Sequence, residues 1–250
     1  MAEPAQTLLP ASPFAGFTGR GVRVAIIDSG VHPAHPHIDA ARISAGVLVM
    51  PDGSIEAGTD ITLDRMGHGT AVTAAFQEKA PETECVPVRV FRDSLKTSAA
   101  ALIAAIRWSI RDGVDIINLS LGSPNAAHCA AFAAVAEEAR EAGVTLVAAR
   151  EANDAPCYPG ALPQVLGVTL DWDCPRERYG IRWEGDLPLL SASGYPRPIP
   201  GVPLQRNLYG ISFAVAQMSG FAALACEAIE QGRDPHRPER LRQALISTSR

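Results

Sequence analysis

The sequence has few of the features that mark disulfide-bonded, zinc-binding or nucleic-acid-binding proteins. It contains five cysteines among 250 residues, an odd number at irregular spacing and without a Cys-x-x-Cys pair. We therefore expect free thiols in a reducing compartment rather than a disulfide framework or a zinc site. The formal net charge is −5, and this mildly acidic balance argues against a nucleic-acid groove or a basic membrane-binding surface.

The sequence also lacks long hydrophobic runs and a secretion signal. The segments 116–136 and 207–226 carry no Asp, Glu, Lys or Arg, but polar residues interrupt both, so neither is expected to span a membrane. The first 20 residues have no basic segment followed by a long apolar stretch, the pattern of a Sec signal peptide. Together with the unpaired cysteines, these absences predict a cytoplasmic protein without a membrane partner.

What the sequence does contain is an alternation of apolar strands and helices. The uninterrupted, β-branched run Val22–Ile27 is typical of a buried parallel strand, and residues 172–209, rich in Pro, Gly and Arg, predict loops with a hairpin. Such alternation favours a layered α/β fold with a mostly parallel sheet. Further strands are predicted at 86–90, 114–119, 144–149 and 165–170, and helices at 67–79, 98–112, 126–142, 211–231 and 238–247.

No internal repeat and no long linker divides the chain. We expect residues 1–20 to form an N-terminal extension and residues 21–250 to form a single domain. In sheets of this kind, ligand sites lie at the carboxyl ends of the strands, so polar residues that follow a strand are the first candidates for function.

Three such residues could carry chemistry. Asp28 follows the first predicted strand, His68 is flanked by glycine on both sides, and Ser212 begins an Ala-rich helix. Each has an ordinary structural explanation as a turn residue or a helix cap. Together they supply a carboxylate, an imidazole and a hydroxyl, the groups by which an oriented base activates a serine nucleophile.

The segments around these residues resemble those of subtilisin-like serine peptidases, and the resemblance covers most of the chain. It implies a three-layer α/β fold with a mostly parallel central sheet and helices on both faces, and a peptide or protein substrate. We expect neither a cofactor nor a metal. The matching segments are VAIIDSGV at 24–31, GHGTAV at 67–72, INLSLG at 117–122, YPGALP at 158–163, and GISFA at 210–214 followed by Ser219-Gly220.

The resemblance also implies a mechanism. Ser212 Oγ attacks a peptide carbonyl to form an acyl-enzyme, His68 accepts the serine proton, and Asp28 orients His68. Replacing Ser212 or His68 is then expected to cost about 10⁶ in kcat, the scale seen in subtilisin itself. Activity is expected to rise with pH near neutrality, because His68 must be unprotonated to act as a base.

Two more parts of the site are assigned by resemblance. Ser120, Leu121 and Gly122 correspond to the edge that lines the specificity pocket and pairs with the substrate backbone. The family uses an Asn in a turn as its side-chain oxyanion donor. Without a gap Ala152 stands at this position, and with a one-residue insertion Asn153 does. We assign Asn153, and the loss of such a donor costs on the order of 10²–10³ in rate.

Some residues depart from the family pattern. Ile211 stands where the family usually has Thr, Ala216 where it usually has Pro, and Ala71 where a second His is common. These departures bear on the level of activity and not on the fold. They leave open a second interpretation, a catalytically weak or inactive fold that binds peptides along residues 120–122. A nucleotide-binding protein is disfavoured, since there is neither a GxGxxG segment after the first strand nor a P-loop.

Three histidines, His32, His35 and His37, lie close together in the sequence. Two prolines separate them, and no cysteine or carboxylate cluster accompanies them, so we expect a solvated loop rather than a metal site. Calcium-binding loops are not identifiable. The segments Trp172–Pro175 and Ser193–Pro200 are predicted to be proline-stiffened loops near the substrate cleft.

The segment before the first predicted strand bears on regulation. Its roughly 20 residues are fewer than a small domain requires, whereas secreted members of the family carry an inhibitory pro-domain of about that size. A protease without such an inhibitor must be restrained by narrow specificity, weak activity or a partner. We therefore expect processing of a particular peptide or protein precursor, and rapid general digestion of casein would contradict this expectation.

Overall fold

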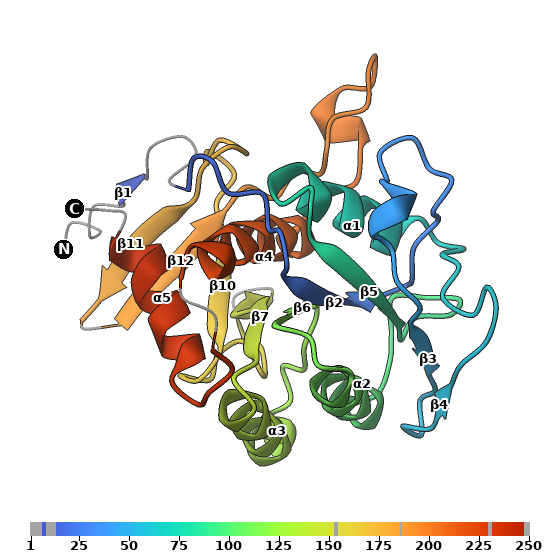
Figure 1. The fold of residues 1–250 in the computed structure, drawn as a ribbon, viewed down its shortest axis with the longest axis horizontal. Helices are drawn as coiled ribbons and strands as arrows, with labels where there is room; N and C mark the ends of the chain where they lie inside the picture. The colour runs from blue at the N-terminus through green and yellow to red at the C-terminus, as the bar shows by residue number, and fades with distance from the viewer. Residues whose placement is uncertain (1–6, 9–13, 153–154, 186, 230–231, 248–250) are drawn as a thin grey trace.

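The computed structural model describes residues 7–8, 14–152, 155–185, 187–229 and 232–247, and these form a ten-stranded sheet between two layers of helices (Figure 1). The expected three-layer α/β fold is confirmed. From edge to edge the strands are β1 (Thr7–Leu8), β11 (Gly180–Glu184), β12 (Leu187–Ala192), β10 (Leu166–Leu170), β7 (Thr145–Ala149), β6 (Ile116–Leu119), β2 (Arg23–Asp28), β5 (Glu84–Arg89), β3 (Val47–Val49) and β4 (Ile55–Glu56).

The strands from β12 to β3 run parallel to one another, and the edges are antiparallel. The central strand β2 is buried from Val24 to Asp28, as its uninterrupted apolar run predicts. A separate small sheet pairs β8 (Glu151–Ala152) with β9 (Ala155–Pro156). The parallel arrangement brings the carboxyl ends of β2 and β6 to the same edge, where Asp28 and Ser120 lie.

The sequence prediction was incomplete in several places, of which two concern the main sheet most directly. The hairpin expected within 172–209 is present as β11 and β12, but β12 also joins the main sheet in parallel to β10. Pro188 lies inside β12, and a proline within an apolar run argues against a strand that pairs on both sides. The strand β3 was not predicted, because three residues are too short a run to show periodicity.

Five helices among the described residues cover the sheet, and their distribution defines two cores (Figure 1). One core lies beneath α1, α4 and α5, and the other beneath α2 and α3. The region 126–142 was predicted as one helix, but it begins with a 3₁₀ turn, Ala126–His128, capped by Asn125. The helices are α1 (His68–Lys79), α2 (Ala99–Asp112), α3 (Cys129–Glu141), α4 (Ile211–Ala228) and α5 (Arg237–Ser247).

The helix α4 lies at the centre of its layer, against α1, α5 and the strands β6, β7, β10 and β12. It is long and apolar enough to cross a membrane by length and composition alone, with a mean hydropathy of 1.4. However, 78 % of it is buried within this fold, so its apolar character is explained by core packing. Its first turn carries Ser212 to the edge where β2 and β6 end.

Candidate active site

Asp28 and His68 form a direct pair at the carboxyl end of β2. The Asp28 side chain is completely buried, and its Oδ1 lies 2.7 Å from His68 Nδ1 and accepts a second hydrogen bond, 2.8 Å long, from the Ser29 N–H. Asp28 Oδ2 is buried without a hydrogen-bond partner among the described residues. The carboxylate therefore fixes the orientation of the imidazole and leaves Nε2 free to face the cleft.

This pair depends on a close approach between the start of α1 and the turn after β2. His68 is the first residue of α1, and a Cβ on the next residue, Gly69, would overlap the backbone carbonyl of Gly30. Only glycine permits this contact. The Gly69 N–H also donates a 2.8 Å hydrogen bond to Ser29 Oγ, which ties the helix to the residue after Asp28.

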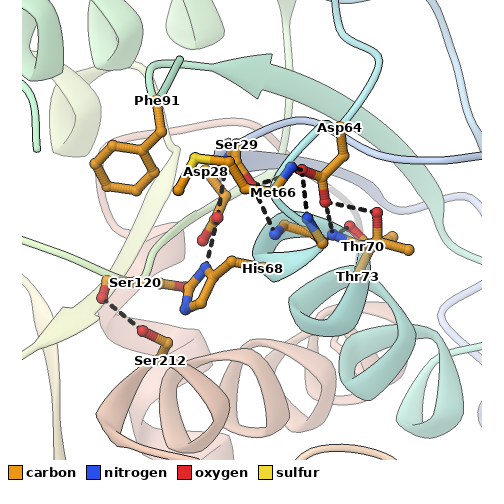
Figure 2. Close-up of polar contacts among 12 residues, drawn as sticks. Asp28, Ser29, Asp64, Met66, His68, Thr70, Thr73, Phe91, Ser120 and Ser212 are labelled. Atoms are coloured by element: carbon orange, nitrogen blue, oxygen red, sulfur yellow. Dashed lines mark hydrogen bonds and ion pairs between the residues drawn. The ribbon is translucent and has the colours of Figure 1, made fainter. Parts of the chain in front are cut away.

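The start of α1 is held by a second buried carboxylate, Asp64, which sequence reasoning did not assign. Its Oδ1 accepts hydrogen bonds from Ser29 Oγ (3.0 Å), the Met66 N–H (2.8 Å) and the Gly67 N–H (2.9 Å). Its Oδ2 accepts from the N–H (2.8 Å) and the hydroxyl (2.6 Å) of Thr70. Figure 2 shows this carboxylate beside the first turn of α1. An acidic residue shortly before the start of a helix is the sequence feature that could have identified Asp64.

These carboxylates shift the pKa values of the groups around them. Burial by itself lowers the pKa of His68, but the hydrogen bond and charge of Asp28, with a smaller contribution from Asp64, raise it above the ordinary value of 6.5. Burial works in the opposite direction on Asp64, yet hydrogen bonds from Thr70, Met66 and Gly67 hold the pKa of its carboxyl below 3.8. Asp64 is therefore ionised wherever His68 can act as a base.

Ser212 lies on the other side of the His68 ring from Asp28 (Figure 2). Its Oγ donates a 3.3 Å hydrogen bond to the carbonyl of Ser120, and no hydrogen bond joins it to His68 in the described structure. The ring of Phe213 lies beside His68, with centroids 5.8 Å apart. Hydrogen bonds between a nucleophile and its base are often long before substrate binds, so this arrangement is compatible with a resting site.

A buried polar contact fixes Ser212 relative to Ser120. Asn118, near the end of β6, donates a 3.0 Å hydrogen bond to Ser120 Oγ and accepts one of 2.9 Å from Ser219 Oγ on α4. All three of these side chains are buried. The contact joins the end of β6, which Ser120 follows, to α4, which carries Ser212. The sequence did not predict this contact.

The segment assigned to substrate binding lies directly beside these residues. Ser120 is buried, whereas Leu121 and Gly122 are half-buried beyond the end of β6. Ser123 then pairs with Tyr158 through two backbone hydrogen bonds, of 2.8 and 2.9 Å. The assigned oxyanion residue, Asn153, lies outside the described residues, and its role stays a prediction.

The three histidines line a separate cleft on the side of α1. The cleft, which we call the histidine cavity, has a volume of about 440 Å³ and is bounded by His32, His35, His37, Arg65 and Arg197, together with apolar residues of 196–208. Pro196, Arg197 and Ile199, from the proline-rich segment 193–200, line this histidine cavity, and the position of the segment beside the substrate cleft stays a prediction. Within the described residues, no group of three or more His, Cys, Asp or Glu side chains is arranged to hold a metal ion.

Comparison with known families agrees with this geometry. The sequence model of the Subtilase family matches residues 19–250. The chain belongs to the subtilase family of serine peptidases. Among its relatives, subtilisin E of Bacillus subtilis (strain 168) is 27 % identical over 245 residues, which cover 88 % of this chain and 59 % of that protein. The subtilisin-like protease SBT6.1 of Arabidopsis thaliana is 26 % identical over 257 residues, or 92 % of this chain and 24 % of that protein.

Solved structures show the same subtilase fold. A cold-adapted subtilisin-like serine proteinase superposes with a TM-score of 0.68 at 22 % identity, covering 90 % of this chain and 81 % of that one. A lanthipeptide protease superposes with a TM-score of 0.67 at 18 % identity, covering 92 % and 89 %. At these identities the likeness establishes the fold alone. The chain spans less than two thirds of the two sequence relatives named above.

Proposed function

We propose that this subtilase is a serine endopeptidase in which Ser212, His68 and Asp28 act as nucleophile, base and orienting carboxylate. The observation that carries the proposal is the convergence of the three side chains, with His68 held at 2.7 Å by a buried Asp28 and lying between it and Ser212 (Figure 2). These three groups come from the end of β2 and the first turns of α1 and α4, and no shared structural role explains why they converge.

The chemical steps follow from these positions. Ser212 Oγ attacks the peptide carbonyl while its proton moves to His68 Nε2, and the imidazolium that forms is stabilised by Asp28. His68 then donates this proton to the departing amine as the C–N bond breaks, which leaves an acyl-enzyme on Ser212. Water, deprotonated by His68, attacks the ester carbonyl and releases the acid. We propose that the backbone N–H of Ser212 donates to the oxyanion, together with the side chain of Asn153.

We further propose that the enzyme processes a peptide or protein precursor with narrow specificity inside the cell. The five cysteines are all free, and four of them are buried. Burial raises the pKa of Cys85 to about 12 and of Cys226 to about 11, so these thiols are unreactive core groups. This pattern is typical of a reducing compartment. The lanthipeptide protease among the structural neighbours has the same fold and supports processing of a peptide precursor.

A fluorophosphonate probe tests the catalytic part of this proposal. The probe reacts with a serine only when nucleophile, base and oxyanion donors act together. We expect the purified protein to be labelled, and Ser212→Ala and His68→Ala to lose labelling while they retain the circular dichroism spectrum of the parent. The exposed Ser54, in a surface turn, provides a control, because Ser54→Ala leaves labelling intact.

The same experiment decides between the peptidase and the peptide-binding interpretation. The bond from Ser212 Oγ to the Ser120 carbonyl, in place of one to His68, is the observation that favours a catalytically silent module. A well-folded protein that is not labelled between pH 7 and 9 would contradict the peptidase. Retention of peptides by that unlabelled protein would then support a binding module that uses residues 120–122.

A further inference from the structure

The histidine cavity has a cationic lining that the proposed chemistry does not use. Arg65 is exposed and Arg197 is half-buried, and neither has a carboxylate partner among the described residues. Arg197 instead donates a 3.1 Å hydrogen bond to the backbone carbonyl of His37. Burial, followed by the charge of Arg197, lowers the pKa of His37. The two guanidinium groups are positively charged throughout the working pH range.

The carboxylates near the cavity are already engaged. Asp64 contributes to the cavity wall, but both of its oxygens accept hydrogen bonds from the start of α1, and the residue is only 6 % exposed. Glu78, which acts electrostatically on His37, is paired with Lys79 at 3.0 Å and with Arg176. An incoming anion would therefore meet Arg65 and Arg197 without competition from a free acidic side chain of the protein.

The position of the cavity relates it to one half of a bound peptide. Ser120 lies on one side of the His68 ring in Figure 2, and Asp64 and Thr70 lie on the other. If the acyl half of the substrate pairs with residues 120–122, its other half leaves past His68 on the side of α1. The cavity opens there, and its wall includes Leu208, four residues before the nucleophile.

We propose that the histidine cavity is a subsite for a carboxylate on the leaving-group side of the scissile bond. The inference rests on the proposed peptidase function and names the substrate that it favours, a peptide with Asp or Glu, or with its terminal carboxylate, among the first residues after the cleaved bond. Arg65 and Arg197 supply the charge, and the imidazoles of His35 and His37, packed edge to face at 5.2 Å, supply hydrogen-bonding groups. Ile199 and Leu208 supply apolar contact for the stem of the side chain. The volume of about 440 Å³ is in the range of sites that hold one or two side chains.

Cleavage of a peptide library measures this preference directly. A tryptic peptide library from a bacterial proteome is digested, and the new termini are sequenced by mass spectrometry. We expect Asp and Glu to be enriched after the cleaved bond. Arg65→Gln and Arg197→Gln should each reduce the enrichment about three- to tenfold, as expected for removing one partly exposed ion pair. Arg182→Gln is the matched control, because Arg182 is an exposed arginine on β11 that lies outside the cavity and forms no ion pair within the described structure.

Charge reversal separates recognition from a structural effect. Arg65→Glu should convert the preference from acidic to basic residues at the same position, a change that misfolding cannot produce. Raising the ionic strength from 0.05 to 0.5 M should weaken the acidic preference of the parent, because salt screens the charges. Library peptides with amidated C-termini distinguish a side-chain carboxylate from the terminal one. A preference that is the same in the parent and in Arg65→Glu would overturn the proposal.

A binding measurement keeps this inference separate from the catalytic one. The Ser212→Ala protein is mixed with the same library, and the retained peptides are sequenced. Enrichment of acidic peptides, lost in the Ser212→Ala/Arg65→Glu double variant, supports the subsite even if the parent fails to cleave. Retention without any acidic enrichment, or no retention of peptides at all, overturns the subsite. Absence of fluorophosphonate labelling, by contrast, bears only on the peptidase function.

Discussion

The two ends of the proposed triad are built differently. At the His68 end, Asp28 holds the imidazole at 2.7 Å, and five donors converge on the oxygens of Asp64 to fix the start of α1. At the Ser212 end, the nucleophile has a single 3.3 Å hydrogen bond, to the carbonyl of Ser120. The base is therefore pre-oriented by several short hydrogen bonds, whereas the hydroxyl must exchange its present partner for His68 before it can react.

This contrast follows from what each group does in the reaction. The imidazole gains a charge, and a dipole or carboxylate that is already in place stabilises this charge without reorganisation. The Ser212 hydroxyl must leave its hydrogen bond to the Ser120 carbonyl before it can attack the substrate. Because this bond is long, breaking it costs little free energy. The comparison predicts that disturbing the His68 end has larger effects on rate than disturbing the segment beside Ser212.

Among substitutions that keep both Ser212 and His68, Asp28→Asn is expected to lower the rate most. An amide cannot stabilise the imidazolium, and its N–H favours the wrong tautomer of His68, so kcat should fall about 10⁴-fold. The parent should show a pH–rate midpoint above 6.5, because Asp28 raises the pKa of His68 despite burial, and the residual activity of the variant should titrate at lower pH. Steady-state kinetics from pH 5 to 9 measure both kcat and the midpoint of the pH–rate profile. Asp52→Asn, at an exposed surface carboxylate, is the control, and a loss of less than tenfold in Asp28→Asn would contradict the assignment.

A smaller effect is expected from Asp64→Asn. The amide nitrogen cannot accept the bonds that one carboxylate oxygen now accepts, which should loosen the start of α1 and reduce kcat by on the order of 10- to 100-fold. We also expect a loss of about 1–3 kcal/mol in the free energy of unfolding at pH 7. Differential scanning calorimetry and steady-state kinetics measure the two quantities.

The pH dependence of stability gives a second test of Asp64. Its folded-state pKa lies below 3.8, so its stabilising contribution is present above the ordinary carboxyl pKa and is lost as pH falls through the folded-state value. The difference in Tm between the parent and Asp64→Asn should therefore be constant from pH 7 to 5 and shrink below about pH 4. A difference that grows on acidification would show that Asp64 does not act as an ionised acceptor.

The smallest effect is expected from Gly122→Ala, beside the nucleophile. The new Cβ would overlap the carbonyl of Tyr158 and lie 2.7 Å from Cys157 Sγ, which should push apart the pairing of Ser123 with Tyr158. We expect KM to rise several-fold, kcat to change little, and stability to fall by about 1–3 kcal/mol. Gly58→Ala is the matched control, because a Cβ at Gly58 meets no atom within 4 Å. A fall in kcat as large as that of Asp64→Asn would overturn the ranking.

Local pattern accounts for most of the fold. The apolar run of β2 and the apolar spacing of α2 required no tertiary information, and Ser98 caps α2 by accepting a 2.9 Å hydrogen bond from the Ala101 N–H. The strand β12 was harder to predict, because Pro188 weakens its local signal while its place in the sheet depends on the remote strand β10. Residues whose local preference agrees with the fold are readable from sequence, and residues that depend on distant partners are not.

The residues of the candidate site also fall into those that the sequence predicted and those that it did not. Asp28, His68 and Ser212 were found because chemistry restricts the residue types and a known family supplies their order. Asp64 was missed although it accepts five hydrogen bonds, because a lone aspartate before a helix has many ordinary explanations. The histidine loop was expected to be solvated, and nothing in the sequence placed Arg197 opposite it, since 160 residues separate Arg197 from His37.

The sequence by itself determined the layered α/β fold, the family and the three residues proposed for catalysis, because strand periodicity and reactive side chains are local properties. The tertiary structure decided how tightly each of these residues is held and what lies beside them. The hydrogen bond from Ser29 to Asp64, the contact of Asn118 with Ser219, and the cationic cavity all join segments far apart in the chain. Their energies depend on distances of a few ångströms that only the packing of α1 and α4 on the sheet sets.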